Sequence, residues 1–249
     1  MKRIFFVGIL SAVLGFSTLA GATLYDLKTD WSTAANPNGV WTYRQGTTAL
    51  PLQTDYDRTH LYVSGQHAWA NAQFDPTVYG NNLGHVPVWL KATQDNAFDA
   101  NVKAGDIMVH PTSAVGISAY NQGEANVIWT SPINGTITIT GNVWWGGLYP
   151  DRAVTWYLFD KSDQLGFGTV GYGDGTSHDN PSTFGSFTRT VSVGDTVMFE
   201  AVTASGHQYP WFVGVNLSID AQPTPLPPAA LLFAPGLAGL AVLRRRLKK

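Results

Sequence analysis

Residues 126–145 read NVIWTSPINGTITITGNVWW, and this stretch decides the fold class. From position 136 onward apolar and polar residues alternate, which is the pattern of an extended strand with one buried face. The predicted inner face carries Ile137, Ile139, Val143 and Trp145. The opposite face carries Thr136, Thr138, Thr140, Asn142 and Trp144. Unless a bulge at Gly141 reverses this order, Trp144 is expected on a threonine-rich surface.

Short runs of this kind, bounded by Gly, Pro, Asn and Asp, recur along the chain, which is typical of an all-β sandwich or barrel. The predicted strands are Thr23–Lys28, Val40–Arg44, Val86–Ala92, Asp106–His110, Asn126–Thr130, Thr136–Trp145, Ala153–Asp160, Gly185–Val193, Thr196–Thr203 and Trp211–Asp220. We expect a single antiparallel β-sandwich of jelly-roll type, with its first and last strands paired.

Two glycine-containing turns are predicted to close tight hairpins. Asn134-Gly135 precedes the strand at 136, and Gly194-Asp195 separates two alternating runs. Asparagine and glycine tolerate the positive φ that tight hairpin turns need.

The N-terminus has the pattern of a signal peptide. Lys2 and Arg3 precede an uncharged apolar run, and a stretch of small residues ends at Ala22. A basic start, a short apolar segment and an Ala-x-Ala site predict export, with cleavage after Ala22. The alternatives, a buried helix or a membrane anchor, fit less well because the apolar run is shorter than the roughly 20 residues of a spanning helix.

The C-terminus combines prolines, an apolar run and a basic cluster. Pro225 and Pro227 lead into the uncharged segment 229–243, which Arg244, Arg245 and Arg246 follow. This order resembles the PEP-CTERM sorting signal, although Pro225-Leu226-Pro227 stands where that family has Pro-Glu-Pro. The resemblance implies an exosortase-type processing protease and the inner membrane as partners, and a cell-surface or extracellular location, often in polysaccharide or biofilm systems. A permanent single-span tail anchor is the alternative.

These segments divide the chain into a signal peptide (1–22), a β-sandwich domain (23–220), a proline-rich linker (221–228) and a hydrophobic helix with a basic tail (229–249). The chain has no cysteine, which excludes disulfides, thiolate-zinc sites and cysteine nucleophiles. Seven of the fifteen basic residues lie in the terminal segments, so eight basic residues face seventeen acidic ones in the domain. This acidic balance argues against nucleic acid as a partner.

The candidate ligand-binding residues are aromatic and hydroxyl side chains on predicted strand faces: Trp144, Thr138, Thr140 and Tyr157. Tyr157 and Phe159 alternate with Trp156 and Leu158, so one of these two sets presents an aromatic residue outward. An exposed aromatic ring offers a platform for the apolar face of a sugar ring, and threonine hydroxyls can bind the sugar hydroxyls. The alternative is that loops cover the sheet and Trp144 is a packing residue.

Two oxygen-rich loops are candidates for calcium, which prefers carboxylate and carbonyl ligands. They contain Asp160 and Asp163, and Asp174 and Asp179. Neither loop has the spacing of an EF-hand, so solvated turns are the simpler interpretation, and no cofactor is expected. The six histidines show no zinc-binding spacing.

Three functions therefore remain open. The leading hypothesis is a non-enzymatic surface or matrix protein whose sandwich contacts polysaccharide. A carbohydrate-active enzyme is the second, and it needs Glu124 or Glu200, the only glutamates, beside a further carboxylate in one cleft. The third is a structural coat protein without a ligand, in which Trp144 and Tyr157 would both be buried.

Overall fold

The computed structural model describes residues 21–54, 56, 65–72, 85–97, 101–112 and 124–225. Residues 1–20 of the predicted signal peptide and the predicted sorting tail after Pro225, with Pro227, Arg244, Arg245 and Arg246, lie outside these described residues. Every regular element in the described ranges is a β-strand, so the predicted all-β class is confirmed. Within those ranges no helix is long and apolar enough to cross a membrane.

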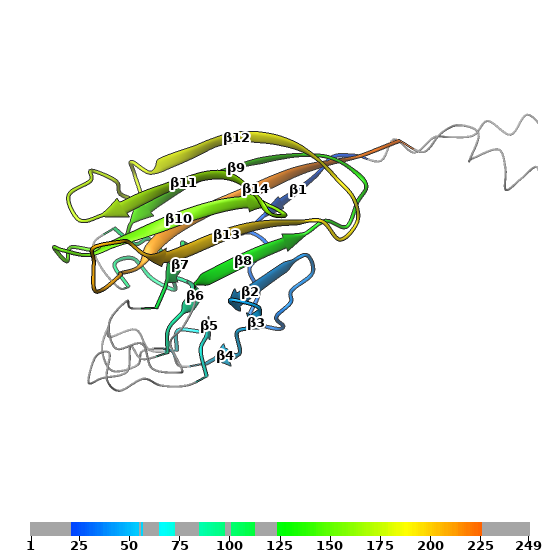
Figure 1. Cartoon of the computed structure of the whole chain (residues 1–249). Coiled ribbons are helices and arrows are strands. Elements are labelled where there is room, and N and C mark those ends of the chain that lie inside the picture. The colour runs from blue at the N-terminus through cyan, green and yellow to red at the C-terminus, as the bar shows by residue number, and fades with distance from the viewer. Residues whose placement is uncertain are drawn as a thin grey trace, which may run out of the picture. The chain divides into compact units, whose positions relative to one another are not determined.

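The strands are β1 (Thr23–Asp26), β2 (Trp41–Gln45), β3 (Thr48–Ala49), β4 (Leu52–Gln53), β5 (Ala68–Ala70), β6 (Val88–Lys91), β7 (Ile107–His110), β8 (Ala125–Thr130), β9 (Gly135–Trp145), β10 (Ala153–Asp160), β11 (Asp163–Gly171), β12 (Ser182–Val191), β13 (Thr196–Thr203) and β14 (Val213–Pro223). The long strands β9, β10, β12, β13 and β14 run alongside one another, and the short strands β4 to β6 lie together at one side (Figure 1).

These strands form two antiparallel sheets. Sheet A has the order β12-β9-β14-β7-β6-β5-β4, and β1 pairs with a further part of β14. Sheet B has the order β11-β10-β13-β8-β2-β3. The pairing of β1 with β14, with Thr23 opposite Ala221, confirms that the first and last strands are neighbours.

The two sheets pack face to face around one hydrophobic core. Phe199 of sheet B contacts Trp89 and Phe184 of sheet A, with ring centroids 6.2 and 6.3 Å apart. Phe184 also lies 5.4 Å from Trp156 of β10. Because aromatic side chains bury large apolar areas, these contacts hold the layers together and confirm the sandwich.

The predicted alternation of inner and outer side chains is also confirmed. In β9, Ile137, Ile139 and Val143 are fully buried, and the register against β14 continues through Gly141 without a shift. In β10, Val154, Trp156 and Leu158 are buried, whereas Thr155, Tyr157 and Phe159 are only partly buried.

The hairpin predicted at Asn134-Gly135 is wrong. β8 belongs to sheet B and β9 to sheet A, so this turn carries the chain from one sheet to the other. Gly135 is already part of β9, and its lack of a side chain lets the backbone of β14 approach closely. A Cβ at this position would lie 2.2 Å from the carbonyl oxygen of Gln222.

The hairpin predicted at Gly194-Asp195 is wrong for the same reason, because β12 lies in sheet A and β13 in sheet B. The N–H of Gly194, at φ +92°, donates to the Ser131 carbonyl at 2.8 Å. The Ser131 N–H donates to the Asp195 carbonyl, also at 2.8 Å. The two crossing turns therefore bind each other at one end of the sandwich.

Strand β11 is absent from the predicted set. Its glycines resemble a loop, yet Gly168 faces Trp156 on the neighbouring strand. A Cβ at Gly168 would lie 2.9 Å from the indole of Trp156, so the glycine provides the space for that ring. At the other end of the domain, β14 extends to Pro223, into the range predicted as linker.

Candidate functional site

The candidate residue Trp144 lies on the outer side of sheet A, as the alternation predicts, but it is buried, with 1% of its surface exposed. Its indole N–H donates to the carbonyl of Asn101 at 3.1 Å, and its ring meets His178 edge-on at 5.4 Å. The ring also lies against Gly214 of β14, where a Cβ would be 1.9 Å away. The expectation of an exposed platform at Trp144 is therefore wrong, because connecting segments cover this end of the sheet.

Thr138 and Thr140 lie on the same outer face of sheet A but do not join an aromatic platform. Thr138 stands between Thr188 and Asp220 in register, and Thr140 between Ser186 and Ser218. Thr140 is exposed and Thr138 is half-buried. This part of the face is a polar surface, and it lies on the opposite side of the sandwich from Tyr157.

Three aromatic residues on the outer side of sheet B form what we call the aromatic face: Tyr157 and Phe159 of β10, and Phe167 of β11. The rings of Tyr157 and Phe167 lie 6.3 Å apart with 19° between their planes. Tyr157 and Phe159 lie 6.1 Å apart at 25°. Phe167 is 66% exposed. The three nearly parallel rings thus present an apolar surface to solvent.

Hydroxyl groups lie beside the aromatic face. Thr155 and Thr169 are neighbours in register on β10 and β11, and their hydroxyl oxygens are 3.1 Å apart. Each threonine lies two residues from an aromatic residue on its own strand, so it projects from the same side of the sheet. An apolar platform beside hydroxyls can hold a ligand with one apolar and one hydroxylated side.

Two carboxylates lie at the other edge of the aromatic face. Glu200 of β13 is directly opposite Tyr157 and is half-buried. Burial raises the pKa of Glu200, and the negative charge of Glu124 raises that pKa further. Glu124 precedes β8 by one residue and lies two residues from Asn126, the β8 partner of Glu200. Glu124 is thus close enough for its charge to act on the carboxyl group of Glu200.

The four candidate calcium ligands are not brought together. Asp160 and Asp163 flank the β10–β11 hairpin turn; Asp160 is buried, with Lys161 and Arg189 as ion-pair partners at 3.9 and 3.6 Å, and Asp163 is exposed. Asp174 accepts hydrogen bonds from the N–H groups of Gly171 and Thr176, at 2.8 and 2.7 Å, which fixes its own loop. Asp179 is exposed in the same loop. Within the described ranges, no three His, Asp or Glu side chains form a metal-binding group.

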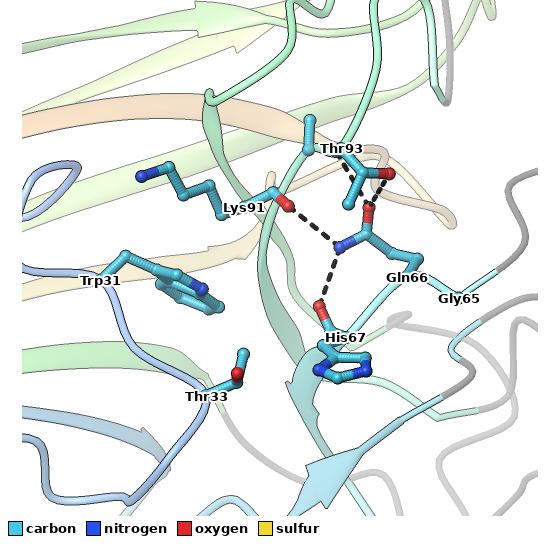
Figure 2. Close-up of a pocket in the computed structure, with 8 residues that line it drawn as sticks. Trp31, Thr33, Gly65, Gln66, His67, Lys91 and Thr93 are labelled. Carbon is cyan, nitrogen blue, oxygen red and sulfur yellow. Dashed lines mark hydrogen bonds between the residues drawn. The ribbon is translucent and has the colours of Figure 1, made fainter.

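A separate cavity of about 310 Å³ lies beside the start of β5 and the end of β6, and it is lined by Trp31, Thr33, Gly65, Gln66, His67, Lys91, Ala92 and Thr93. Figure 2 shows the indole of Trp31 on one side of this cavity and the amide of Gln66 on the other. A second cavity, of about 300 Å³, lies between Tyr25, Asp30 and Trp41.

Sequence reasoning misses Phe167 and the residues of the Trp31 cavity. For Phe167 a signal exists, because Leu165, Phe167 and Thr169 alternate with Gly166, Gly168 and Val170. No local signal marks Trp31, Thr33 or His67, because three separate segments bring the cavity residues together.

No protein-family model matches the sequence, and no curated protein matches it significantly. Among solved structures, the CBM51-2 and INT domains of ZmpB from Clostridium perfringens, in complex with GlcNAc, are 10% identical at a TM-score of 0.28, covering 47% of this chain and 22% of that one. The K1 cleaved adhesin domain of Lys-gingipain from Porphyromonas gingivalis W83 is 9% identical at a TM-score of 0.34, and the match covers 81% of this chain and 98% of that one. The CBM22-1 xylan-binding domain of Xyn10C from Paenibacillus barcinonensis is 8% identical at a TM-score of 0.30, and the match covers 81% of this chain and 94% of that one.

The chain spans less than a quarter of the first of these structures. Identities and TM-scores this low establish neither a shared fold nor a shared function.

Proposed function

We propose that the chain is an exported, non-enzymatic cell-surface or extracellular-matrix protein that binds polysaccharide through the aromatic face of sheet B. The observation that carries this proposal is the exposure of Phe167, which stands in line with Tyr157 and Phe159. A large apolar side chain exposed on a regular strand contributes little to folding, whereas it can cover the apolar side of a sugar ring. A structural protein without a ligand would bury both Trp144 and Tyr157; Trp144 is buried, but Tyr157 is only half-buried, so this alternative is met in one of its two residues.

The size of the aromatic face sets the expected affinity. Burying roughly 50 Å² at each of the three rings, at about 25 cal/mol per Å², gives about 4 kcal/mol. That free energy corresponds to a dissociation constant of about 1 mM. One site therefore binds weakly, and useful retention needs several copies acting together on one polymer.

The test compares two equally exposed apolar residues on opposite sheets. Phe167→Ala removes about a third of the platform and is expected to weaken binding about tenfold, since 1.4 kcal/mol is a factor of ten. Leu24→Ala is the control, because Leu24 is 65% exposed on β1 of sheet A. Affinity electrophoresis in gels containing soluble polysaccharides measures both variants. Equal retention of Phe167→Ala, Leu24→Ala and the parent on every binding polysaccharide refutes the proposed face.

Export and sorting belong to the same proposal. The basic and apolar start of the chain supports signal cleavage after Ala22, and the first strand begins at the next residue, Thr23. The proline, apolar and arginine segments of the tail support processing by an exosortase-type protease at the inner membrane. The intact mass of protein from the native host tests both: a species retaining residues 1–22 refutes signal cleavage, and one retaining residues 244–249 favours a permanent anchor.

We also propose a jelly-roll topology for β7 to β14. The orders β7-β14-β9-β12 in sheet A and β8-β13-β10-β11 in sheet B support it, because consecutive strands mostly alternate between the sheets, as two nested Greek keys require.

Hydrolysis of a glycosidic bond is a second candidate, favoured by the Glu124–Glu200 interaction beside the aromatic face. In that reaction Glu200, whose pKa is raised by burial and by the nearby charge, donates a proton to the leaving sugar oxygen, while Glu124 accepts a proton from the water that attacks the sugar carbon. Release of reducing sugar ends from bound polysaccharide tests it. If the parent chain releases reducing ends and Glu200→Gln abolishes this release while it still binds the polymer, hydrolysis replaces the non-enzymatic proposal. If the parent chain releases no reducing ends, hydrolysis is rejected.

A further inference from the structure

The Trp31 cavity has one rigid polar side. The buried amide of Gln66 donates to the carbonyls of His67 and Lys91, at 2.8 and 3.0 Å. The Gln66 side-chain oxygen accepts hydrogen bonds from the N–H and the hydroxyl of Thr93, both at 3.3 Å. Figure 2 shows these hydrogen bonds joining the side chain of Gln66 to His67, Lys91 and Thr93. Both polar atoms of the Gln66 side chain are therefore hydrogen-bonded within the protein, and they hold the polar side of the cavity in place.

The opposite side is the indole of Trp31, which the surrounding contacts hold in place. Trp31 meets Tyr43 in an edge-on contact at 4.8 Å. The carbonyl of the next residue, Ser32, accepts a hydrogen bond from the indole N–H of buried Trp69 at 3.0 Å. The segment is also fixed before Trp31, where Asp30 accepts a hydrogen bond from the indole N–H of Trp41 at 3.0 Å. The aromatic side of the cavity is therefore formed before any ligand binds.

Three polar groups at the cavity are not engaged elsewhere. The described residues offer no hydrogen-bond partner to the indole N–H of Trp31, to the hydroxyl of Thr33 or to the ring nitrogens of His67. The ammonium of Lys91, in contrast, donates to the carbonyl of Lys28 at 2.8 Å. Among the described lining residues, the cavity thus combines an aromatic wall with three available polar groups, and the ammonium of Lys91 is already hydrogen-bonded.

We propose that this cavity binds a single neutral sugar ring, as a chain end or as a free glycoside. A volume of about 310 Å³ is at the lower end of the roughly 300–1,000 Å³ found for small-molecule sites, which suits one ring and not a polymer segment. The Trp31 indole covers the apolar side of the ring, while Thr33 and His67 bind its hydroxyls. The site is separate from the aromatic face, so the protein has one surface for polymers and one cavity for single rings.

Saturation-transfer NMR on the full-length chain tests this assignment, with the methyl glycosides of glucose, galactose, xylose and N-acetylglucosamine as probes at millimolar concentration. We expect transfer to at least one glycoside and its loss in Trp31→Ala. Because Trp31→Ala also removes a packing contact, Thr33→Val serves as a second variant that deletes only the hydroxyl, and we expect it to weaken binding about tenfold. No transfer to any probe, or transfer unchanged in both variants, overturns the proposal.

Phe167→Ala separates this test from that of the proposed function. We expect Phe167→Ala to keep glycoside transfer while it loses polymer retention, and Thr33→Val to do the reverse. Loss of glycoside transfer in Phe167→Ala would place the sugar on the aromatic face and overturn the assignment to the Trp31 cavity.

Discussion

Trp144→Ala is the substitution that best separates packing from ligand contact in sheet A. The side chain is 1% exposed, so its removal leaves a cavity that the neighbouring backbone of β14 cannot fill. Emptying a buried aromatic site costs about 3–5 kcal/mol. The substitution also removes the 3.1 Å hydrogen bond to the Asn101 carbonyl. We expect a total loss of about 4 kcal/mol in the free energy of unfolding, a large part of the usual 5–15 kcal/mol.

Equilibrium unfolding in urea, followed by fluorescence and circular dichroism, measures this loss. Thr140→Ala is the matched control, because Thr140 is an exposed residue on the same strand, and its loss is expected within about 0.5 kcal/mol. A destabilisation below about 1 kcal/mol for Trp144→Ala would refute the buried placement of the indole and reopen its role as a sugar platform.

A double-mutant cycle tests the cause more closely. Gly214→Ala should destabilise the parent, because the new methyl group meets the Trp144 ring at 1.9 Å. In the Trp144→Ala background the same methyl group enters vacated space, so the double variant should be more stable than the sum of the two losses predicts. Additive losses would mean that the two residues do not touch.

Three further outcomes follow from the same structure. Gly168→Ala should cost about 1–3 kcal/mol, because its methyl group meets Trp156 at 2.9 Å, whereas Gly166→Ala, with 3.6 Å of space, should be nearly neutral in the same denaturation assay. Burial lowers the pKa of His110 to about 4, so between about pH 6.5 and pH 4 the unfolded chain binds a proton that the native state does not bind. The free energy of unfolding therefore falls on the order of 3 kcal/mol as the pH is lowered across that window, and His110→Gln should flatten this part of the pH–stability curve. Burial raises the pKa of Glu200, so its ionisation opposes folding above its ordinary range, and Glu200→Gln should stabilise the protein at pH 7 but not near pH 3.

Local alternation predicts strands and their inner faces, but not their partners. The pattern around residues 136–145 places Ile137 and Ile139 in the core correctly. The same pattern fits a hairpin and a crossing between sheets equally well, so Asn134-Gly135 and Gly194-Asp195 are assigned wrongly. Which sheet a strand joins depends on the packing of both layers, and that packing has no local signature in the sequence.

The candidate site shows the same division. The alternation of Tyr157 with Trp156 and Leu158 predicts that one of the two sets faces outward, and the structure shows that it is the set with Tyr157. The burial of Trp144, however, depends on Asn101 and His178, which are 43 and 34 positions away in the chain. Exposure is a property of the covering segments, and a strand pattern contains no information about them.

The pairing of β1 with β14 has a consequence for how the domain is made. The hydroxyl of Ser218 donates to the carboxylate of Asp26 at 2.7 Å, across 192 positions of sequence. Sheet A therefore lacks β14, its link between β9 and β7, until the last residues of the domain have been synthesised. Folds dominated by such distant pairings form slowly, because a long loop loses chain entropy on closing before the contacts that stabilise the closed state have formed. A nascent domain that lacks β14 cannot close sheet A, so the late position of this strand delays formation of the whole sandwich until synthesis of the domain is complete.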